Sequence, residues 1–244
     1  MRRHRPPMLN KLLVIMLAAT TAAAHAAPRA PPAGSVAISH HVLRNGVHVA
    51  VVNEQFENRD GRYHIVSESV PVGLLALVQP RPATLTSTGR ITENGLQPER
   101  FEGGRGASDA RRVNAEFDWA GAKLSLTHDG RSERVDLPAG TQDRLSIMYQ
   151  FMFFSYGERR EIDFAMTNGR KLDHYRYAIT RNVEIDTPLG RMTTLHLVKQ
   201  REPGDSETEI WLAPQHRYLP VRMLIVESDG ARYEQAATRL EVQP

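Results

Sequence analysis

Apolar and polar residues alternate along much of the chain. Val113, Ala115 and Phe117, for example, are separated by Asn114 and Glu116. A period of two with one apolar face is typical of a strand in an antiparallel sheet that is wetted on one side. A helix would instead repeat its apolar positions every three to four residues. The alternating segments are residues 113–119, 161–166, 174–179 and 219–225.

Turn signals recur along the same part of the chain and before it. Asn-Gly and Asp-Gly pairs tolerate the positive φ angles of tight hairpin turns, so most of them should reverse one strand directly into the next. We expect roughly ten to twelve strands in one antiparallel meander. A sheet of that size curls into a barrel or half-barrel and encloses more space than its own side chains fill. The turn signals are Asn45-Gly46, Asp60-Gly61, Asn94-Gly95, Asp129-Gly130, Asn168-Gly169, Pro203-Gly204 and Asp229-Gly230.

Residues 141–157 depart from the alternation. Residues 144–157 read RLSIMYQFMFFSYG, and their apolar side chains would surround a helix instead of forming one stripe. That distribution predicts a helix that is buried nearly all round. Thr141 is the expected N-cap, Asp143 suits the first turn, and Gly157 can end the helix in the left-handed conformation. The sequence therefore predicts a mainly β fold, a curved antiparallel meander wrapped around a buried helix at 141–157.

A second apolar stretch covers residues 70–78 and reads VPVGLLALV. Its periodicity does not separate a short helix from an edge strand, because short apolar runs fit both. Both interpretations of residues 70–78 therefore stay open from the sequence.

The first 26 residues have the composition of an export signal. A basic start precedes an apolar core at residues 12–24, and Ala24-His25-Ala26 has the small-x-small pattern that signal peptidase reads. This core is shorter than the roughly 20 apolar residues of a membrane-spanning helix. We therefore expect a cleavable signal peptide at residues 1–26.

The rest of the chain should form one domain. Residues 27–34 are rich in proline and predict a flexible leader, and residues 35–244 predict a single β-rich domain. The chain contains no cysteine, which excludes a lipid-modified Cys at the mature N-terminus and any disulfide. We expect an exported periplasmic protein that is not a lipoprotein and does not span the membrane after signal cleavage.

Charge gives no reason to expect a nucleic-acid partner. The whole chain has 31 Lys+Arg and 28 Asp+Glu, a formal net charge of +3. Removing residues 1–26 takes away four basic residues and no acidic one, which leaves 27 against 28. A mature chain so close to neutrality lacks the basic surface of a nucleic-acid-binding protein.

Several short motifs occur in a fixed order between residues 95 and 222. They are Gly95-Leu96-x-Pro98-x-x-Phe101, Phe117-Asp118-Trp119, Leu137-Pro138-x-Gly140-x-Gln142-Asp143-Arg144-Leu145-Ser146, Thr187-Pro188-Leu189-Gly190, Ile210-Trp211-Leu212-Ala213-Pro214 and Leu219-Pro220-Val221-Arg222. These motifs resemble a family of exported bacterial proteins, domain-of-unknown-function family 3108. The resemblance implies an envelope location in Gram-negative bacteria and a single β-rich domain, and it implies no activity or catalytic residue. The strand pattern is more distantly similar in architecture to periplasmic lipoprotein carriers, in which a curved antiparallel sheet wraps helices and shelters acyl chains.

No catalytic motif is found in the sequence. It contains no G-x-S-x-G nucleophile elbow, and without cysteine it can have no thiol nucleophile. Histidines lack the spacing of a metal site; His40 and His41, for example, would point to opposite faces of a strand. We expect no enzyme activity, metal or cofactor, and an envelope hydrolase is only a remote alternative.

Asp143 and Arg144 admit two interpretations. At the start of a helix they would cap its first turn and form an ion pair with the rim of the sheet, which is the favoured interpretation. Contact with a ligand is the other.

The predicted function is to bind a hydrophobic ligand, such as a lipid or acyl chain, between the sheet and the helix. Methionine adapts its shape and suits varied apolar cargo, although it also fills gaps in ordinary cores. The alternative is an envelope protein–protein interaction or assembly module with a filled core and an exposed patch elsewhere. An empty volume of several hundred Å³ would favour a ligand. The candidate lining residues are Phe151, Met152, Phe154, Tyr175, Tyr177 and Met223.

Overall fold

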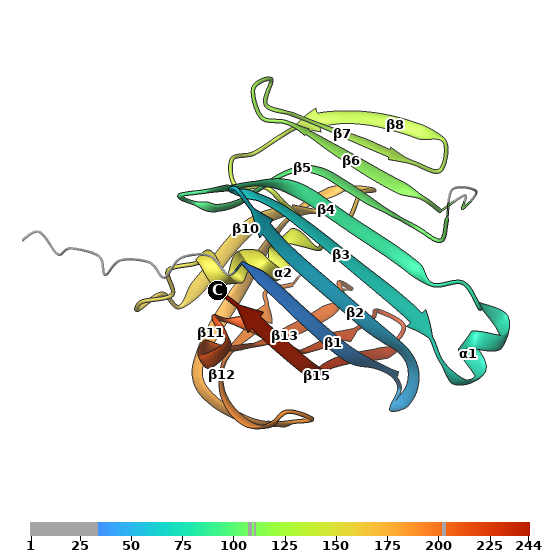
Figure 1. The fold of residues 1–244 in the computed structure, drawn as a ribbon, viewed down its shortest axis with the longest axis vertical. Coiled ribbons are helices and arrows are strands. Elements are labelled where there is room, and N and C mark those ends of the chain that lie inside the picture. The colour runs from blue at the N-terminus through green and yellow to red at the C-terminus, as the bar shows by residue number, and fades with distance from the viewer. Residues whose placement is uncertain (1–33, 107–108, 110, 202–203) are drawn as a thin grey trace, which may run out of the picture. The chain divides into compact units, whose positions relative to one another are not determined.

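The fold is a mainly β structure, seen in a computed structural model (Figure 1). The predicted signal peptide at 1–26 and the leader at 27–34 lie outside the described residues, apart from Gly34. The described residues are 34–106, 109, 111–201 and 204–244. The first strand begins at Ser35.

The described residues contain fifteen strands, two short α-helices and two 3-10 turns, joined by loops. The first eight strands are β1 (Ser35–Arg44), β2 (Val47–Arg59), β3 (Arg62–Pro71), β4 (Ala83–Thr92), β5 (Gly95–Gly104), β6 (Val113–Asp118), β7 (Lys123–His128) and β8 (Arg131–Asp136). The others are β9 (Gln142–Asp143), β10 (Glu161–Thr167), β11 (Leu172–Thr187), β12 (Gly190–Lys199), β13 (Glu207–Ala213), β14 (Leu219–Val226) and β15 (Arg232–Gln243). The helical elements are α1 (Gly73–Val78), α2 (Ser146–Gln150), η1 (Phe151–Phe153) and η2 (Pro214–His216).

All the strands belong to one large curved sheet that does not close. Their order is β8-β7-β6-β5-β4-β3-β2-β1-β15-β14-β13-β12-β11-β10-β9. Every neighbouring pair is antiparallel except β9 and β10. The predicted meander is confirmed, with fifteen strands where ten to twelve were expected. The first strand pairs with the last, and Ser35 stands opposite Gln243.

Hairpin turns form at the Asn-Gly and Asp-Gly pairs. Asn45 and Gly46 between β1 and β2 have φ angles of 50° and 79°, and Asp60 and Gly61 between β2 and β3 have 52° and 75°. Positive φ at both central residues is the type I′ geometry that matches the twist of adjacent strands. These local signals therefore set the strand boundaries.

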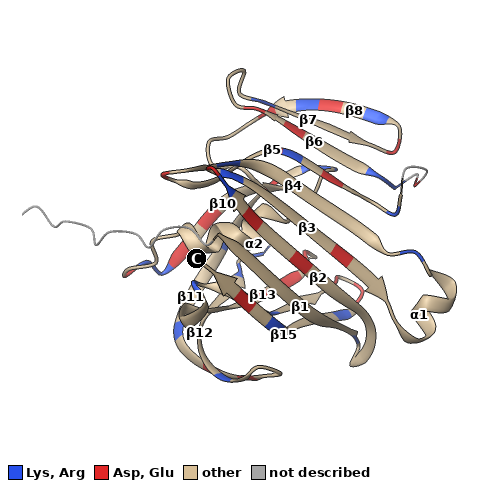
Figure 2. Cartoon of the chain, viewed as in Figure 1, with Lys and Arg blue, Asp and Glu red and all other residues tan. Residues whose placement is uncertain are grey.

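The strand β8 is one free edge of the sheet and is lined with charge. Arg131, Glu133, Arg134 and Asp136 alternate in sign along it, and positive and negative residues are interspersed on the neighbouring strands as well (Figure 2). Charged side chains on an exposed edge oppose pairing with the edge of another molecule.

The helix expected at 141–157 is much shorter than predicted. Gln142 and Asp143 form β9 and pair with β10, so Thr141 is no N-cap. The Asp143 carboxylate accepts the backbone N–H groups of Leu145 and Ser146, both at 2.8 Å, so the helical turn begins only after it. Residue 154 is already extended (φ −70°, ψ 138°), which ends the helical segment well before Gly157.

The helical segment is buried on opposite sides, as its apolar distribution predicts. Leu145, Tyr149 and Phe153 belong to one buried cluster, which includes side chains from both halves of the sheet. Ile147 and Phe151 belong to a second cluster, formed with β10 to β13. Positions four residues apart lie on the same helical face, so two faces of the short segment are buried in two different clusters.

Residues 70–78 end an interior strand and then form a short helix, so the helix considered for them is found and the edge strand is not. β3 ends at Pro71, and α1 follows as one helical turn and a half. Its outer face is apolar: Leu74 is 83% exposed, Leu77 79% and Val78 75%. The helix joins β3 to β4 and projects beyond the ends of these strands (Figure 1).

Candidate functional site

A cavity of about 1550 Å³ lies in the hollow of the sheet. Its walls are the inward faces of β1 to β4 on one side and β10 to β15 on the other. Residues 141–153, which contain β9, α2 and η1 and are called the α2 segment below, complete it with side chains between positions 144 and 151. The turns β10–β11, β12–β13, β14–β15, β1–β2 and β3–β4 lie along one edge of the sheet, because alternate turns of a meander share an edge. Polar residues from the first three of these turns line the cavity at that edge: Asn168, Ser206 and Glu227.

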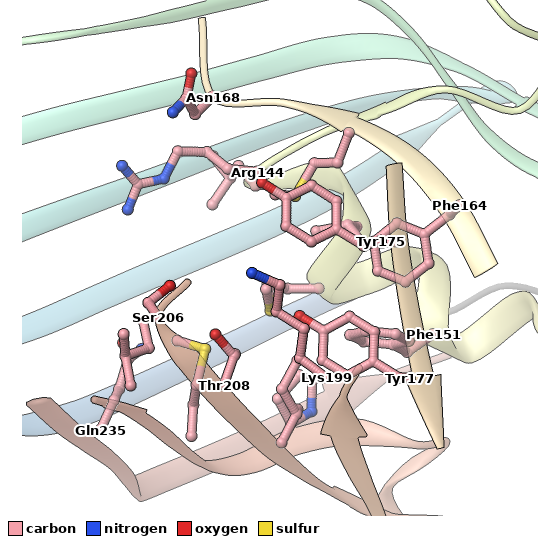
Figure 3. A pocket seen from close by; sticks show the side chains of 18 of the residues that line it. Arg144, Phe151, Phe164, Asn168, Tyr175, Tyr177, Lys199, Ser206, Thr208 and Gln235 are labelled. Carbon is pink, nitrogen blue, oxygen red and sulfur yellow. The ribbon is translucent and has the colours of Figure 1, made fainter. Parts of the chain in front are cut away.

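An aromatic wall forms the apolar side of the cavity. The ring of Phe164 on β10 stacks on those of Tyr177, at 5.7 Å between centroids, and Tyr175, at 6.0 Å, both on β11. The ring of Phe151 meets that of Phe164 edge-on at 6.2 Å (Figure 3). Offset and edge-to-face pairs of this kind hold aromatic side chains in fixed orientations.

The structure brings four of the six predicted lining residues together at the cavity. Phe151, Tyr175, Tyr177 and Met223 are on its wall. The other two, Met152 and Phe154, are not among the lining residues, although the sequence places them in the same segment. The short helical turn explains their positions. Met152 packs against the first buried cluster, and Phe154 packs behind Phe151 and Phe164.

Two glutamine side chains fasten the α2 segment to β5. Gln150 Oε1 accepts the Leu96 N–H at 2.7 Å, and its Nε2 donates to the Asn94 carbonyl at 2.9 Å. Gln142 Nε2 donates to the Leu96 carbonyl at 2.9 Å. Gly95 makes room for this contact, because a Cβ there would lie 2.3 Å from the Gln150 amide oxygen. These side-chain amides thus link β9 and α2 to the start of β5.

A buried polar network positions the start of the segment. Ser87 Oγ donates to Asp143 Oδ2 at 2.6 Å, so the Tyr63 hydroxyl, 3.1 Å from Ser87 Oγ, is the donor in that second bond. Burial raises the pKa of Asp143, and the hydrogen bonds from Ser87, Ser146 and Leu145 oppose that rise. Asp143 therefore has a structural role, as the capping interpretation expects.

Glu54 is the second carboxyl close to this site. Its two oxygens each accept one hydrogen bond, from the Tyr149 hydroxyl and from Ser67 Oγ, both at 3.2 Å. Burial raises the pKa of Glu54, while these bonds and the charge of Arg144 lower it. Burial likewise raises the pKa of Tyr149 well above its usual value, and Glu54 adds to that rise.

Arg144 lines the cavity without the ion pair that the sequence interpretation favoured. Among the described residues no carboxylate lies within 4.0 Å of its guanidinium, and no hydrogen bond reaches its side chain. The guanidinium points into open space in the cavity (Figure 3). The capping role assigned to this pair of residues therefore belongs to Asp143 alone.

His40 is a buried titratable residue on the cavity wall. It is 5% exposed, and within the described part of the chain its Nδ1 has no hydrogen-bond partner. Burial lowers the pKa of His40 to about 4, although a hydrogen bond with the Pro220 backbone opposes the decrease. His40 is therefore neutral near pH 7.

The two lysines that line the cavity each lie close to an aspartate. Lys171 Nζ lies 2.7 Å from Asp173, and Lys199 Nζ lies 3.6 Å from Asp205 and 5.5 Å from the Tyr175 ring. Within residues 34–244, gaps excepted, no three His, Asp or Glu side chains converge as a metal site would require. The described helices include none with the length and apolarity to cross a bilayer.

The fold and cavity define a β-barrel-like protein with an open interior. The chain belongs to the family described as "Protein of unknown function (DUF3108)", whose profile matches residues 36–236. This confirms the family resemblance. No curated protein matches the sequence.

A solved structure shares the fold at low sequence identity, and another resembles it more weakly. A β-barrel-like protein of domain-of-unknown-function family 1849 from Brucella abortus has a TM-score of 0.53 and 9% identity, over 88% of this chain and 100% of that chain. A protein from Parabacteroides distasonis, described as a candidate lipoprotein, has a TM-score of 0.35 and 11% identity, over 88% and 97% of the two chains. The first comparison supports the β-barrel-like fold alone.

Proposed function

We propose that the protein is a non-enzymatic periplasmic protein that binds a hydrophobic ligand of lipid or acyl type between the sheet and the α2 segment. The cavity of about 1550 Å³ carries the proposal. It is larger than the roughly 300–1,000 Å³ of ordinary small-molecule pockets. A ligand with a long apolar part fits both that size and the wall of Phe164, Tyr175 and Tyr177.

The aromatic wall can supply a useful binding energy. Each buried methylene contributes about 0.8 kcal/mol, so about ten of them would contribute about 8 kcal/mol. Part of that gain offsets the lost translational and conformational freedom of the ligand. Affinity would therefore depend on how much of the ligand's acyl chain the protein covers, and specificity would come from the shape of the cavity.

The interaction-module alternative receives less support. It requires a filled core, and the cavity weighs against that requirement. Its one favourable observation is α1, where Leu74, Leu77 and Val78 expose an apolar face at the end of β3.

Mass spectrometry on protein exported to and purified from a native periplasm tests the proposal. The intact protein should carry a lipid or other apolar molecule close to one-to-one, and solvent extraction should release and identify it. Ligand-free protein that also fails to take up added palmitic acid would overturn the proposal and favour the interaction module.

A further inference from the structure

Arg144 is the one polar side chain in residues 141–150 that the fold leaves without a hydrogen-bond partner. All ten positions are described, and the six other polar side chains each hold the segment in place. Those six are Thr141, Gln142, Asp143, Ser146, Tyr149 and Gln150. A structural role accounts for each of them and leaves Arg144 unexplained.

The surroundings of Arg144 place it inside the cavity near its polar edge. Its backbone N–H donates to the carbonyl of Thr167 at 2.9 Å, beside the β10–β11 turn. The side chain is exposed, yet burial lowers the pKa of Arg144, while the charges of Glu54 and Asp143 raise it. These observations agree because the surface that Arg144 exposes lies within the cavity that it lines, where water reaches the side chain but protein atoms surround it.

The nearby carboxylates are held by other groups. Glu54 accepts from Tyr149 and Ser67, one bond at each oxygen. Asp143 accepts from Ser87 at one oxygen and from two backbone N–H groups at the other. Both carboxylates reduce the positive potential at Arg144 without occupying its donors. An arginine stays charged at every physiological pH and presents five N–H donors in a planar fork. A partly desolvated guanidinium of this kind is stabilised by a matching anion.

We propose that Arg144 binds the anionic head group, a carboxylate or a phosphate, of an amphiphile whose acyl chain lies against Phe164, Tyr175 and Tyr177. This assignment rests on the proposed function. Tyr175 is close enough to Arg144 to raise the pKa of its guanidinium. The cationic anchor and the aromatic wall therefore adjoin each other (Figure 3). In this arrangement the ligand's head group lies toward the polar edge of the cavity, and its acyl chain lies deeper, toward Phe151.

Pairs of ligands that differ only in charge test the assignment. Binding of palmitic acid is compared with that of hexadecanol, and binding of palmitoyl lysophosphatidic acid with that of monopalmitoylglycerol. The proteins are the delipidated mature wild type, Arg144→Gln, Arg144→Lys and the control Arg131→Gln on the edge strand β8. We expect the wild type to prefer the anionic member of at least one pair by about tenfold or more. That pair identifies the head group as carboxylate or phosphate.

Arg144→Gln should lose that preference while keeping its affinity for the neutral ligands, and Arg144→Lys should retain part of it. The Arg131→Gln control should behave as the wild type. Equal affinity of the wild type for charged and neutral partners would overturn the assignment and leave the proposed function standing; this comparison needs no variant. An Arg144→Gln protein that binds the anionic ligands as tightly as the wild type would also overturn the assignment and leave the proposed function standing. Failure of all four ligands to bind would overturn the proposed function itself.

Discussion

The side-chain amide of Gln150 takes the place of a neighbouring strand for the backbone of Leu96. Its Oε1 accepts the Leu96 N–H at 2.7 Å. On this side of β5, the next strand β6 pairs only with residues 100–103, so the backbone of Leu96 would otherwise be buried without a partner. The glutamine thus joins the helical segment to the sheet and holds one wall of the cavity in place.

Replacing Gln150 with Ala should destabilise the protein by about 1–3 kcal/mol. The change leaves the buried Leu96 N–H unsatisfied, and a buried unpaired group costs about that much, whereas Asn94 is exposed and water can replace the bond to its carbonyl. Urea denaturation measures the free energy of unfolding. Gln55→Ala, at an exposed position on β2, should change it by less than about 0.5 kcal/mol.

Gly95→Ala tests the same contact from the other side. The new Cβ would lie 2.3 Å from the Gln150 amide oxygen, at a residue with φ of +103°. We expect a loss of stability that is smaller in the Gln150→Ala background, because the clash is then relieved and only the backbone strain remains. Equal losses in both backgrounds would contradict the contact.

Ser87→Ala should destabilise the protein more at pH 7 than at pH 5. Burial raises the pKa of Asp143 and the Ser87 hydroxyl opposes that rise, so its removal raises the pKa further. A group with a raised folded-state pKa supports the fold when protonated and loses that support as pH rises through the folded-state pKa. The difference in unfolding free energy between Ser87→Ala and wild type checks this, with Ser39→Ala, whose hydroxyl bonds at the surface, as control. A difference that is the same at both pH values would contradict the assignment.

His40 should make the protein less stable in mild acid. Its folded-state pKa of about 4 lies below the ordinary 6.5, so between these values the unfolded chain binds more protons than the folded one. Its contribution to stability is complete above pH 6.5 and is lost as pH falls toward 4, by about 3 kcal/mol in total.

His40→Gln should flatten that part of the stability curve, measured by urea denaturation from pH 4 to 7.5. The matched control is His64→Gln, at an exposed position on β3, which should leave the curve unchanged. A His40→Gln protein with the wild-type slope would show that other groups cause the pH dependence.

Met223→Trp should weaken the binding of palmitic acid with little loss of stability. Met223 lines the cavity, so the larger side chain can enter empty space instead of overpacking a core. Val198→Trp, at a position that is 38% exposed on the strand β12, is the control and should bind as the wild type. Unchanged uptake by Met223→Trp would argue for a binding site elsewhere.

The local sequence alone determined the strands, their hairpins and the burial of the segment after residue 144. Alternation in Val113, Ala115 and Phe117 needs only the period of a strand, and Asn45-Gly46 needs only the φ angles of a tight turn. Both properties depend on residues a few positions apart, and for that reason they can be read without knowledge of the fold.

Long-range pairing decided the rest. The first and last strands meet because β1 pairs with β15, and residues 142–143 join β10, which shortens the predicted helix. Arg144 lacks the expected ion pair because the fold places no carboxylate of the described residues within 4.0 Å of its guanidinium, while Ser87 and Ser67, distant in sequence, bond to the nearby carboxylates. Whether a charged side chain is paired or left facing a cavity depends on which acceptors the tertiary structure has occupied, and no local pattern carries that information.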